Sequence, residues 1–224
     1  MPVTTEPGAA DTAAPVNGSH PERGFHFGVG WLAALLIVGL LLGAGGTLLA
    51  GRLVGHPGDT SPEAGFLRDM STHHAQAVEM GMIAHQKSAD VNIVTLAGDI
   101  SLTQHGQIGY MQAWLRDWSL SPTGSDPPMS WMPDARGSVV NGLMPGMATP
   151  QQVDQLRNAT GKQLDTQFLT LMRAHHLGGI HMAQGILEQS DNKDVRWLAE
   201  TMVSGQQSEL NLIDDLLKKA QASS

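Results

Sequence analysis

The chain contains no cysteine. This absence excludes disulfide bonds, thiolate metal sites and cysteine nucleophiles, and it leaves histidine, methionine and carboxylates as the available metal ligands. Aromatic residues are also few, with four Phe, five Trp and one Tyr among 224 residues. Leu, Ile, Val, Met and Ala must therefore build the core, and that composition favours helices over sheets.

Basic residues are scarce relative to acidic ones, and the formal net charge is -8. We therefore expect no nucleic-acid partner, because phosphate-backbone binding relies on basic side chains. No glycine-rich phosphate loop is present either, since the GAGG at residues 43–46 belongs to an apolar stretch. We identify no catalytic residue in the sequence and expect a binding protein rather than an enzyme.

A long stretch lacks charge altogether. Residues 24–51 carry no formally charged side chain and are bracketed by Arg23 and Arg52. A membrane helix needs about 20 apolar residues. We predict a transmembrane signal-anchor helix over residues 24–51, after a disordered tail at residues 1–23 that has no apolar period. The balanced arginines do not decide the orientation.

Two long helices are predicted after this stretch. The first has Thr60 or Ser61 as its N-cap, Pro62 in its first turn, and an end near Lys87. The second begins near Asp90 and carries apolar residues at a spacing of three and four. Residues 119–148, which are rich in proline and glycine, predict an irregular connection.

Helical signals resume at Thr149. A break is predicted between residues 158 and 161, followed by a capping box of Thr160 with Gln163. A helix should then run to about Gln189 and be followed by a last helix.

The chain contains an internal repeat. Shifting it by 102 residues aligns residues 63–115 with 165–217 without a gap and gives 11 identities. Each copy is a helical hairpin, and two hairpins joined by a connection predict an all-α four-helix bundle over residues 58–220.

The repeat places histidine and methionine on the inward face of its first helix, at about 100 degrees per residue. The candidate metal ligands are Met70, His73, His74 and Met80 in the first copy and Met172, His175, His176 and Met182 in the second. Imidazole together with thioether suits copper, especially the reduced ion. The side chains expected to support these ligands are Glu63, Gln104, Gln107, Asp165, Gln206 and Glu209.

Two other interpretations use the same residues. In the first, no metal binds, and a buried polar layer of histidines bonded to Gln104, Gln107, Gln206 and Glu209 fixes the helix register. Replacing Gln104 or Gln206 by Leu would then leave an imidazole unpartnered and cost about 1 to 3 kcal/mol. The second is a metal-dependent oxidase.

Several histidines and methionines lie outside the repeated set. His85 is too far along its helix to join the same ion, and we expect His105 and His181 on the surface. Four methionines of the connection indicate either soft-metal capture or a loop packed over an apolar rim: Met129, Met132, Met144 and Met147.

Met-x-x-His-His, an apolar stretch and a further Met occur twice, with MPGMATPQQVDQL before the second copy and Gln206-x-x-Glu209-Leu210 after it. Over residues 62–217 this pattern resembles the domain of unknown function 305 family. The resemblance implies a ferritin-like bundle that is exported or membrane-anchored in bacteria, with copper binding or tolerance in some members. This chain departs from the family pattern at Thr72, Ala174 and Gln107. We therefore expect a protein anchored in the cytoplasmic membrane through residues 24–51, with an extracytoplasmic domain that binds copper.

Overall fold

The computed structural model describes residues 28–53, 55–135 and 137–222. Its helices belong to two units, with α1 (Val29–Leu53) in the first and all later helices in the second, which starts at His56. The tail predicted at residues 1–23 and the first part of the predicted span, residues 24–27, lie outside the described residues.

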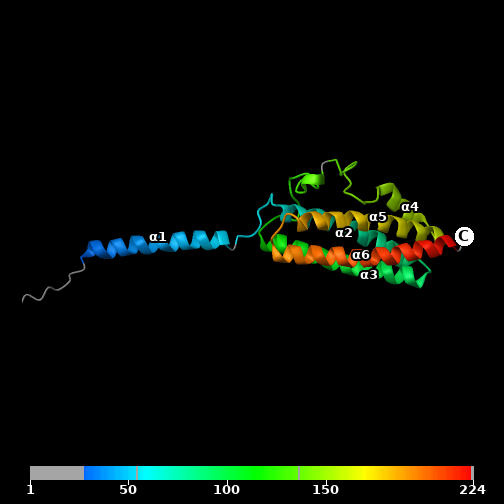
Figure 1. The fold of residues 1–224 in the computed structure, drawn as a ribbon, viewed down its shortest axis with the longest axis horizontal. Helices are drawn as coiled ribbons and strands as arrows, with labels where there is room; N and C mark the ends of the chain where they lie inside the picture. The colour runs from blue at the N-terminus through cyan, green and yellow to red at the C-terminus, as the bar shows by residue number, and fades with distance from the viewer. Residues whose placement is uncertain (1–27, 54, 136, 223–224) are drawn as a thin grey trace, which may run out of the picture. The chain divides into compact units, whose positions relative to one another are not determined.

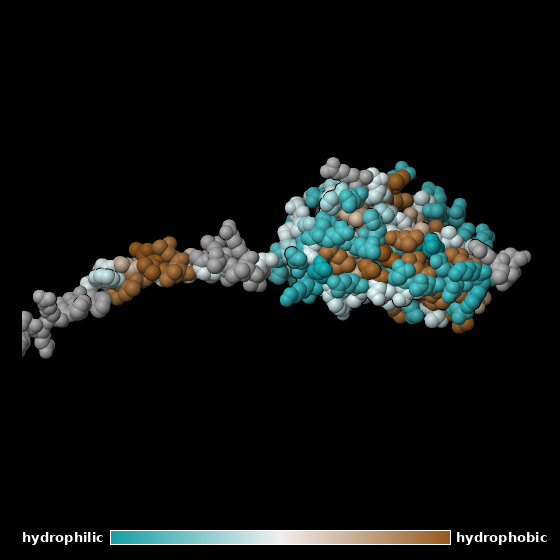
Figure 2. Space-filling model, in the orientation of Figure 1, coloured by the Kyte–Doolittle hydropathy of each residue, from teal (hydrophilic) through white to brown (hydrophobic). Residues whose placement is uncertain are grey.

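The first unit contributes one helix, α1. Its described side chains include exposed apolar residues such as Trp31, Leu36 and Leu42. Figure 2 shows the surface of this helix as largely hydrophobic where it is coloured. Among the described residues, no helix is both long and apolar enough to cross a membrane. The transmembrane helix predicted over residues 24–51 is therefore not supported.

The first predicted hairpin is present as α2 (Pro62–Lys87) and α3 (Val91–Asp117). Ser61 is the N-cap of α2, because its Oγ accepts a hydrogen bond from the Ala64 backbone N–H at 3.2 Å. The Asp90 carboxylate caps α3 by accepting from the Asn92 N–H at 2.8 Å. Local capping chemistry thus places both helix starts close to where the sequence predicts them.

Three helices follow the connection, namely α4 (Pro150–Asn158), α5 (Gly161–Leu187) and α6 (Lys193–Ala222). A complete capping box forms at Thr149 and Gln152, at the start of α4. The box predicted for Thr160 and Gln163 is wrong, because Thr160 makes no side-chain cap. Gly161 opens α5 with a φ of +55°, a backbone that a capping box does not use.

Helices α2, α3, α5 and α6 form a four-helix bundle (Figure 1). Each hairpin packs on itself, α2 packs on α5, and α4 contacts both α2 and α5. Shifted by 102 residues, α2 and α3 would cover 164–189 and 193–219, which nearly coincide with α5 and α6. The described residues form no strand, and the connection holds one 3-10 turn, Pro133–Ala135. The all-α prediction is confirmed.

Two equivalent hydrogen bonds join the ends of the hairpins. Ser88 donates to Asp165 at 2.6 Å, and Ser190 donates to Glu63 at 2.7 Å. Each serine ends the first helix of one repeat and each carboxylate starts the first helix of the other. The two carboxylates thus bond to serines rather than to histidines, about 15 Å of helix rise from the His pairs.

The core consists of two apolar clusters, one toward each end of the bundle. The Met-rich cluster contains the buried methionines Met70, Met111, Met129, Met132, Met144, Met182 and Met202, with Met147 packed against it. The aliphatic cluster contains only Met80 and Met172 beside its Leu, Ile, Val, Ala and Phe. The connection therefore packs its methionines into the core, as one of the two sequence interpretations predicts.

Candidate functional site

A layer of polar side chains separates the two apolar clusters. His73 and His74 on α2 and His175 and His176 on α5 are at most 1% exposed. The ring centroids of His73 and His175 lie 3.8 Å apart, so the two repeats meet here. We call the four histidines with Gln104, Gln107, Gln206 and Glu209 the histidine layer. On every bundle helix its residues lie between those of the two clusters.

Every histidine of the layer has an oxygen partner at Nε2. His74 Nε2 lies 2.8 Å from Gln107 Oε1, and His176 Nε2 lies 2.6 Å from Glu209 Oε2. These two pairs are equivalent in the repeats. The polar-layer interpretation names Gln107 and Glu209 among the histidine partners but does not assign the pairs.

The other two imidazoles bond to backbone. His73 Nε2 lies 3.0 Å from the Pro145 carbonyl oxygen, and His175 Nε2 lies 3.0 Å from the His73 carbonyl oxygen. Carbonyl and carboxylate oxygens accept but do not donate, so Nε2 carries the proton in these histidines. In a neutral imidazole Nδ1 is then left with a lone pair.

None of the four Nδ1 atoms has a hydrogen-bond partner among the described residues, although all four are buried. A buried acceptor without a partner is costly, by about 1 to 3 kcal/mol. The combination also has a chemical meaning. A metal-bound histidine typically coordinates through one ring nitrogen and donates the other N–H to a carboxylate, a carbonyl or water.

Burial keeps His73, His74 and His175 neutral at pH 7. It lowers the pKa of His73 to about 4 and that of His74 to about 3, with further lowering from neighbouring histidines. Burial and the other three histidines also hold the pKa of His175 well below 6.5. Since only a neutral imidazole can coordinate, these three imidazoles are ready to bind a cation across the neutral pH range.

The segment Met144–Ala148 of the connection covers the layer on the α2 and α5 side. A Cβ added at Gly178 would lie 1.9 Å from the Pro145 oxygen, and one at Gly146 would lie 2.2 Å from the Ala174 oxygen. Gly146 has a φ of +79°. Both positions therefore require glycine, which lets the backbone come close enough to place the Pro145 carbonyl at His73.

Sequence reasoning missed the residues that hold this segment. Gln76 accepts from the Ala148 N–H at 2.7 Å and donates to the Ala148 carbonyl at 2.9 Å. The signals in the sequence were the glycine pair after His176 and the MPGM motif. Neither indicates by itself that the two segments contact each other in the fold.

Gln104 and Gln206 are buried, at 3% and 4% exposed, as the sequence predicts. Their predicted bonds to imidazoles are not present. Neither amide atom of Gln104 has a partner among the described residues, and Gln206 Oε1 has none. Both side chains line a pocket of about 40 Å³ between α3 and α6, together with Gln107 and Glu209.

The eight candidate ligands are all buried but do not gather in one place. The histidines lie in one layer, Met70 and Met182 lie in the Met-rich cluster, and Met80 and Met172 lie in the aliphatic cluster. Each cluster thus holds one candidate methionine ligand of each repeat. Within the described ranges, no group of three or more His, Asp or Glu side chains is arranged to hold a metal ion.

The unrepeated histidines lie elsewhere. His85, His105 and His181 are exposed, and His85 Nδ1 lies 2.9 Å from the Val94 carbonyl oxygen, where it joins α2 to α3.

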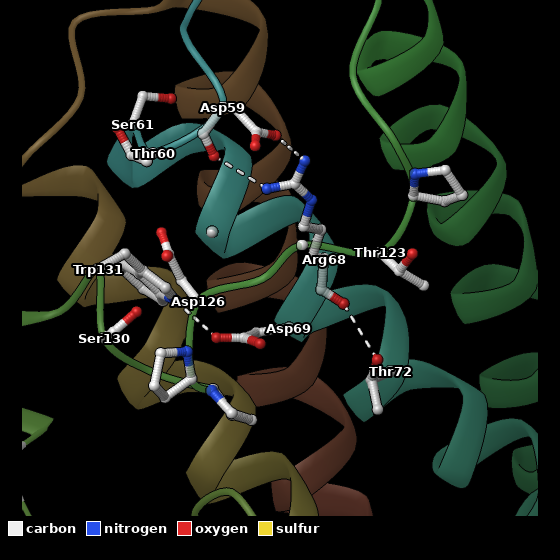
Figure 3. A pocket seen from close by; sticks show the side chains of 15 residues that line it. Asp59, Thr60, Ser61, Arg68, Asp69, Thr72, Thr123, Asp126, Ser130 and Trp131 are labelled. Atoms are coloured by element: carbon white, nitrogen blue, oxygen red, sulfur yellow. Dashed lines mark hydrogen bonds and ion pairs between the residues drawn. The ribbon is translucent and has the colours of Figure 1, made fainter.

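A larger pocket of about 520 Å³ lies between the start of α2 and the connection (Figure 3). Asp69 accepts from the Met129 N–H at 2.6 Å and from Trp131 Nε1 at 2.8 Å, while Arg68 pairs with Asp59. Burial raises the pKa of the Asp69 carboxyl. The two Asp69 bonds fasten the connection to α2, whereas the Arg68 pair holds the residues just before α2.

The fold and its motifs have known relatives. A protein from Streptomyces coelicolor that is predicted to be secreted, described as DUF305, is 43% identical and matches 73% of this chain and 96% of its own with a TM-score of 0.67. A DUF305 fragment from Deinococcus radiodurans is 30% identical, with coverage of 73% and 99% and a TM-score of 0.60. CopM in a Cu(II)-bound form is 22% identical, with coverage of 71% and 97% and a TM-score of 0.55, a likeness in fold alone.

No protein with a curated description matches the chain significantly. The model of the domain of unknown function DUF305 matches residues 63–217, which contain both repeats and the whole histidine layer. The chain belongs to the DUF305 family.

Proposed function

We propose that the protein binds copper, in its reduced form, at the histidine layer. The observation that carries this proposal is the set of four buried Nδ1 atoms without a partner among the described residues, each on an imidazole whose Nε2 already has an oxygen partner. Bound copper would supply the missing partner of the imidazoles. Thioethers of Met70, Met80, Met172 and Met182 flank the layer as soft ligands that favour the reduced ion.

A purely structural layer accounts less well for this arrangement. Such a layer gains stability only when its polar groups are mutually satisfied. Here four Nδ1 atoms and both amide atoms of Gln104 have no partner among the described residues. Each of these unpartnered groups lowers the stability of the fold by about 1 to 3 kcal/mol, so a role in fixing helix register alone explains them poorly.

The choice of copper rests on ligand chemistry. Imidazole with thioether, and no thiolate, suits Cu(I) and Ag(I) better than Zn(II), which takes thiolate, imidazole and carboxylate ligands. CopM, which is 19% identical to this chain with a TM-score of 0.56, has been crystallised in a Cu(I)-bound form, and an Ag-bound form is also known. These ions are therefore the first to test.

We also propose that the helical bundle works outside the cytoplasm, attached to the membrane through residues 24–51. The Streptomyces coelicolor relative, predicted to be secreted, supports export, and the uncharged sequence of residues 24–51 supports attachment. An export-dependent reporter fused after Ser224 should be active, and the protein should sediment with membranes. An active cytoplasmic reporter would contradict export of the bundle. Protein in the soluble fraction would contradict attachment to the membrane.

The binding experiment uses a fragment that begins at His56. It covers a compact unit of its own, and the crystallised relatives consist almost entirely of the matching part. Anaerobic titration with Cu(I) against a competing chelator should give one saturable uptake that is stronger than for Zn(II). Changing both His175 and His176 to Ala should remove most of it.

A matched control changes three exposed histidines, His85, His105 and His181, to Ala. Uptake should then stay at the wild-type level. Absence of Cu(I) uptake in the wild type, or uptake that survives replacement of all four buried histidines, would return the layer to a structural role.

A further inference from the structure

We propose that the pocket between α3 and α6 is the entrance by which a small cation reaches the histidine layer, and that Glu209 attracts the cation to it. This inference rests on the proposed function, because it concerns the route to the same site. Nothing in the sequence pattern alone marks α3 and α6 as the open side of the bundle.

The packing of the bundle leaves this side open. The connection and α4 cover the α2 and α5 side (Figure 1), where Pro145 and Ala148 bond to α2. The α2–α3 and α5–α6 sides are the closely packed hairpins. The opposite side, between α3 and α6, holds the pocket of about 40 Å³.

Exposure falls steadily from the mouth of this pocket to the histidines. Thr103 and Gly205 are exposed at its rim, the Glu209 side chain is 22% exposed, and Gln206 and Gln104 are nearly buried. A volume of about 40 Å³ admits a bare ion or an ion with a water, since one water needs about 10 to 15 Å³, and it excludes a chelate complex.

The polar atoms along the pocket suit a cation that is losing its water. Gln104 Oε1 and Gln206 Oε1 are buried acceptors without a partner among the described residues, and both side chains line the pocket. Amide oxygens of this kind replace hydration water around an ion in selective pores. Glu209 is the only charged side chain that lines the pocket, and it also holds His176.

Blocking the rim tests the route. A Cβ added at Gly205 would meet nothing within 4 Å, so Gly205→Leu should fold and extend a side chain across the pocket. Gly106 on α3 is also exposed and open but does not line the pocket, so Gly106→Leu is the matched control.

Stopped-flow uptake of Ag⁺ by the fragment beginning at His56, followed with a silver indicator, measures the effect. Gly205→Leu should slow uptake by about tenfold or more while the equilibrium affinity stays the same, because a blocked route slows entry and exit alike. Gly106→Leu should behave as the wild type. Equal rates for the wild type and Gly205→Leu would overturn the proposal.

A measurement without metal separates this proposal from the proposed function. Exchange of the Gln104 and Gln206 side-chain amide protons with D₂O, observed by NMR, should be slower in Gly205→Leu and unchanged in Gly106→Leu. If no variant binds Ag⁺, the proposed function fails and this exchange alone decides the entrance. Unchanged exchange in Gly205→Leu then overturns it.

Glu209→Gln tests the attraction. The amide can still accept from His176, just as Gln107 accepts from His74 in the other repeat. Ag⁺ uptake should be about threefold slower or more at low ionic strength, and the difference should shrink as salt screens the charge. A purely structural role of Glu209 predicts no such salt dependence, and equal rates at every salt concentration would refute the attraction.

Discussion

Equivalent positions of the two repeats carry methionine at one end of the bundle and isoleucine at the other. Met202 in the Met-rich cluster corresponds to Ile100 in the aliphatic cluster, and Met111 corresponds to Ile213 in the same way. The connection adds three buried methionines to the same end. One helical frame thus holds two chemically different ends, and the difference lies in the side chains rather than the backbone.

The histidine layer between these ends is nearly symmetric. His74 with Gln107 corresponds to His176 with Glu209, with a carboxylate in place of an amide. The equivalent His73 and His175 both bond to backbone carbonyls but to different ones, those of Pro145 and His73. The comparison indicates that the layer is the shared element of the repeats and that the ends are free to differ.

Acid should have the largest effect, because it acts on the layer that both ends share. Unfolded histidines take up protons below about pH 6.5, whereas folded His73 and His74 do so only near pH 4 and 3. The free energy of unfolding should therefore decrease as the pH is lowered below 6.5. Each of these two histidines should contribute a decrease of about 1.4 kcal/mol per pH unit. Urea unfolding of the fragment from pH 7 to 4.5 measures this slope.

Variants test whether the buried histidines cause the slope. His74→Gln should reduce the slope of unfolding free energy against pH by the amount that corresponds to about one proton. His105→Gln, at an exposed position, should leave this slope unchanged. Tryptophan fluorescence, which reports the Met-rich end through Trp114, Trp118 and Trp131, should change together with helical circular dichroism. If His74→Gln left the slope unchanged, protonation of the buried histidines would not be its cause.

Shortening equivalent core leucines should separate the two ends. Leu67 lies in the Met-rich cluster and Leu169 at the equivalent position in the aliphatic cluster, and both are fully buried. Either change to Ala should cost about 2 to 5 kcal/mol. Leu67→Ala should cost less by about 1 kcal/mol, because flexible methionine side chains fill part of the cavity. Chemical denaturation measures both costs, and an equal or reversed order would show that the ends pack alike.

Replacing Gln104 by Leu should be neutral or stabilising by up to about 2 kcal/mol, because its buried amide has no hydrogen bond to lose. This reverses the sign expected from the sequence, where Gln104 would hold an imidazole. Gln107→Leu is the matched comparison and should destabilise, since it removes the acceptor of His74. A loss of stability in Gln104→Leu would mean that its amide is bonded after all.

Exchanging the unmatched methionines should have the smallest effect. Met111→Ile and Met202→Ile copy the residues at the other end, and such changes conserve volume at a cost below about 1.5 kcal/mol. Cu(I) affinity should change by less than about twofold, or ~0.4 kcal/mol, because the proposed ligands remain. A large loss of affinity would assign copper binding to the Met-rich cluster rather than to the layer.

Local signals allow much of this fold to be predicted from the sequence. The spacing of apolar residues, a cap at Thr60 or Ser61, a helix start near Asp90 and the 102-residue repeat depend on neighbours within a few turns or on a second copy of the same pattern. The polar-layer interpretation includes Gln107 and Glu209 among the expected histidine partners but does not assign which histidine each one bonds. The Pro145 and His73 carbonyls could not be predicted as partners, because backbone groups carry no residue identity. The Pro145 carbonyl reaches His73 only after the connection folds back, and the His73 carbonyl reaches His175 only when α2 packs on α5.

Cation binding through Nδ1 of the buried histidines is tested most directly by the protonation pattern of the four imidazoles. This pattern is measured by ¹⁵N NMR of the histidine-labelled fragment at neutral pH. The account predicts that His73, His74, His175 and His176 all carry their proton on Nε2, and that their Nδ1 resonances shift when one equivalent of Ag⁺ is added. Protons on Nδ1, or Nδ1 resonances that Ag⁺ leaves unchanged, would contradict it.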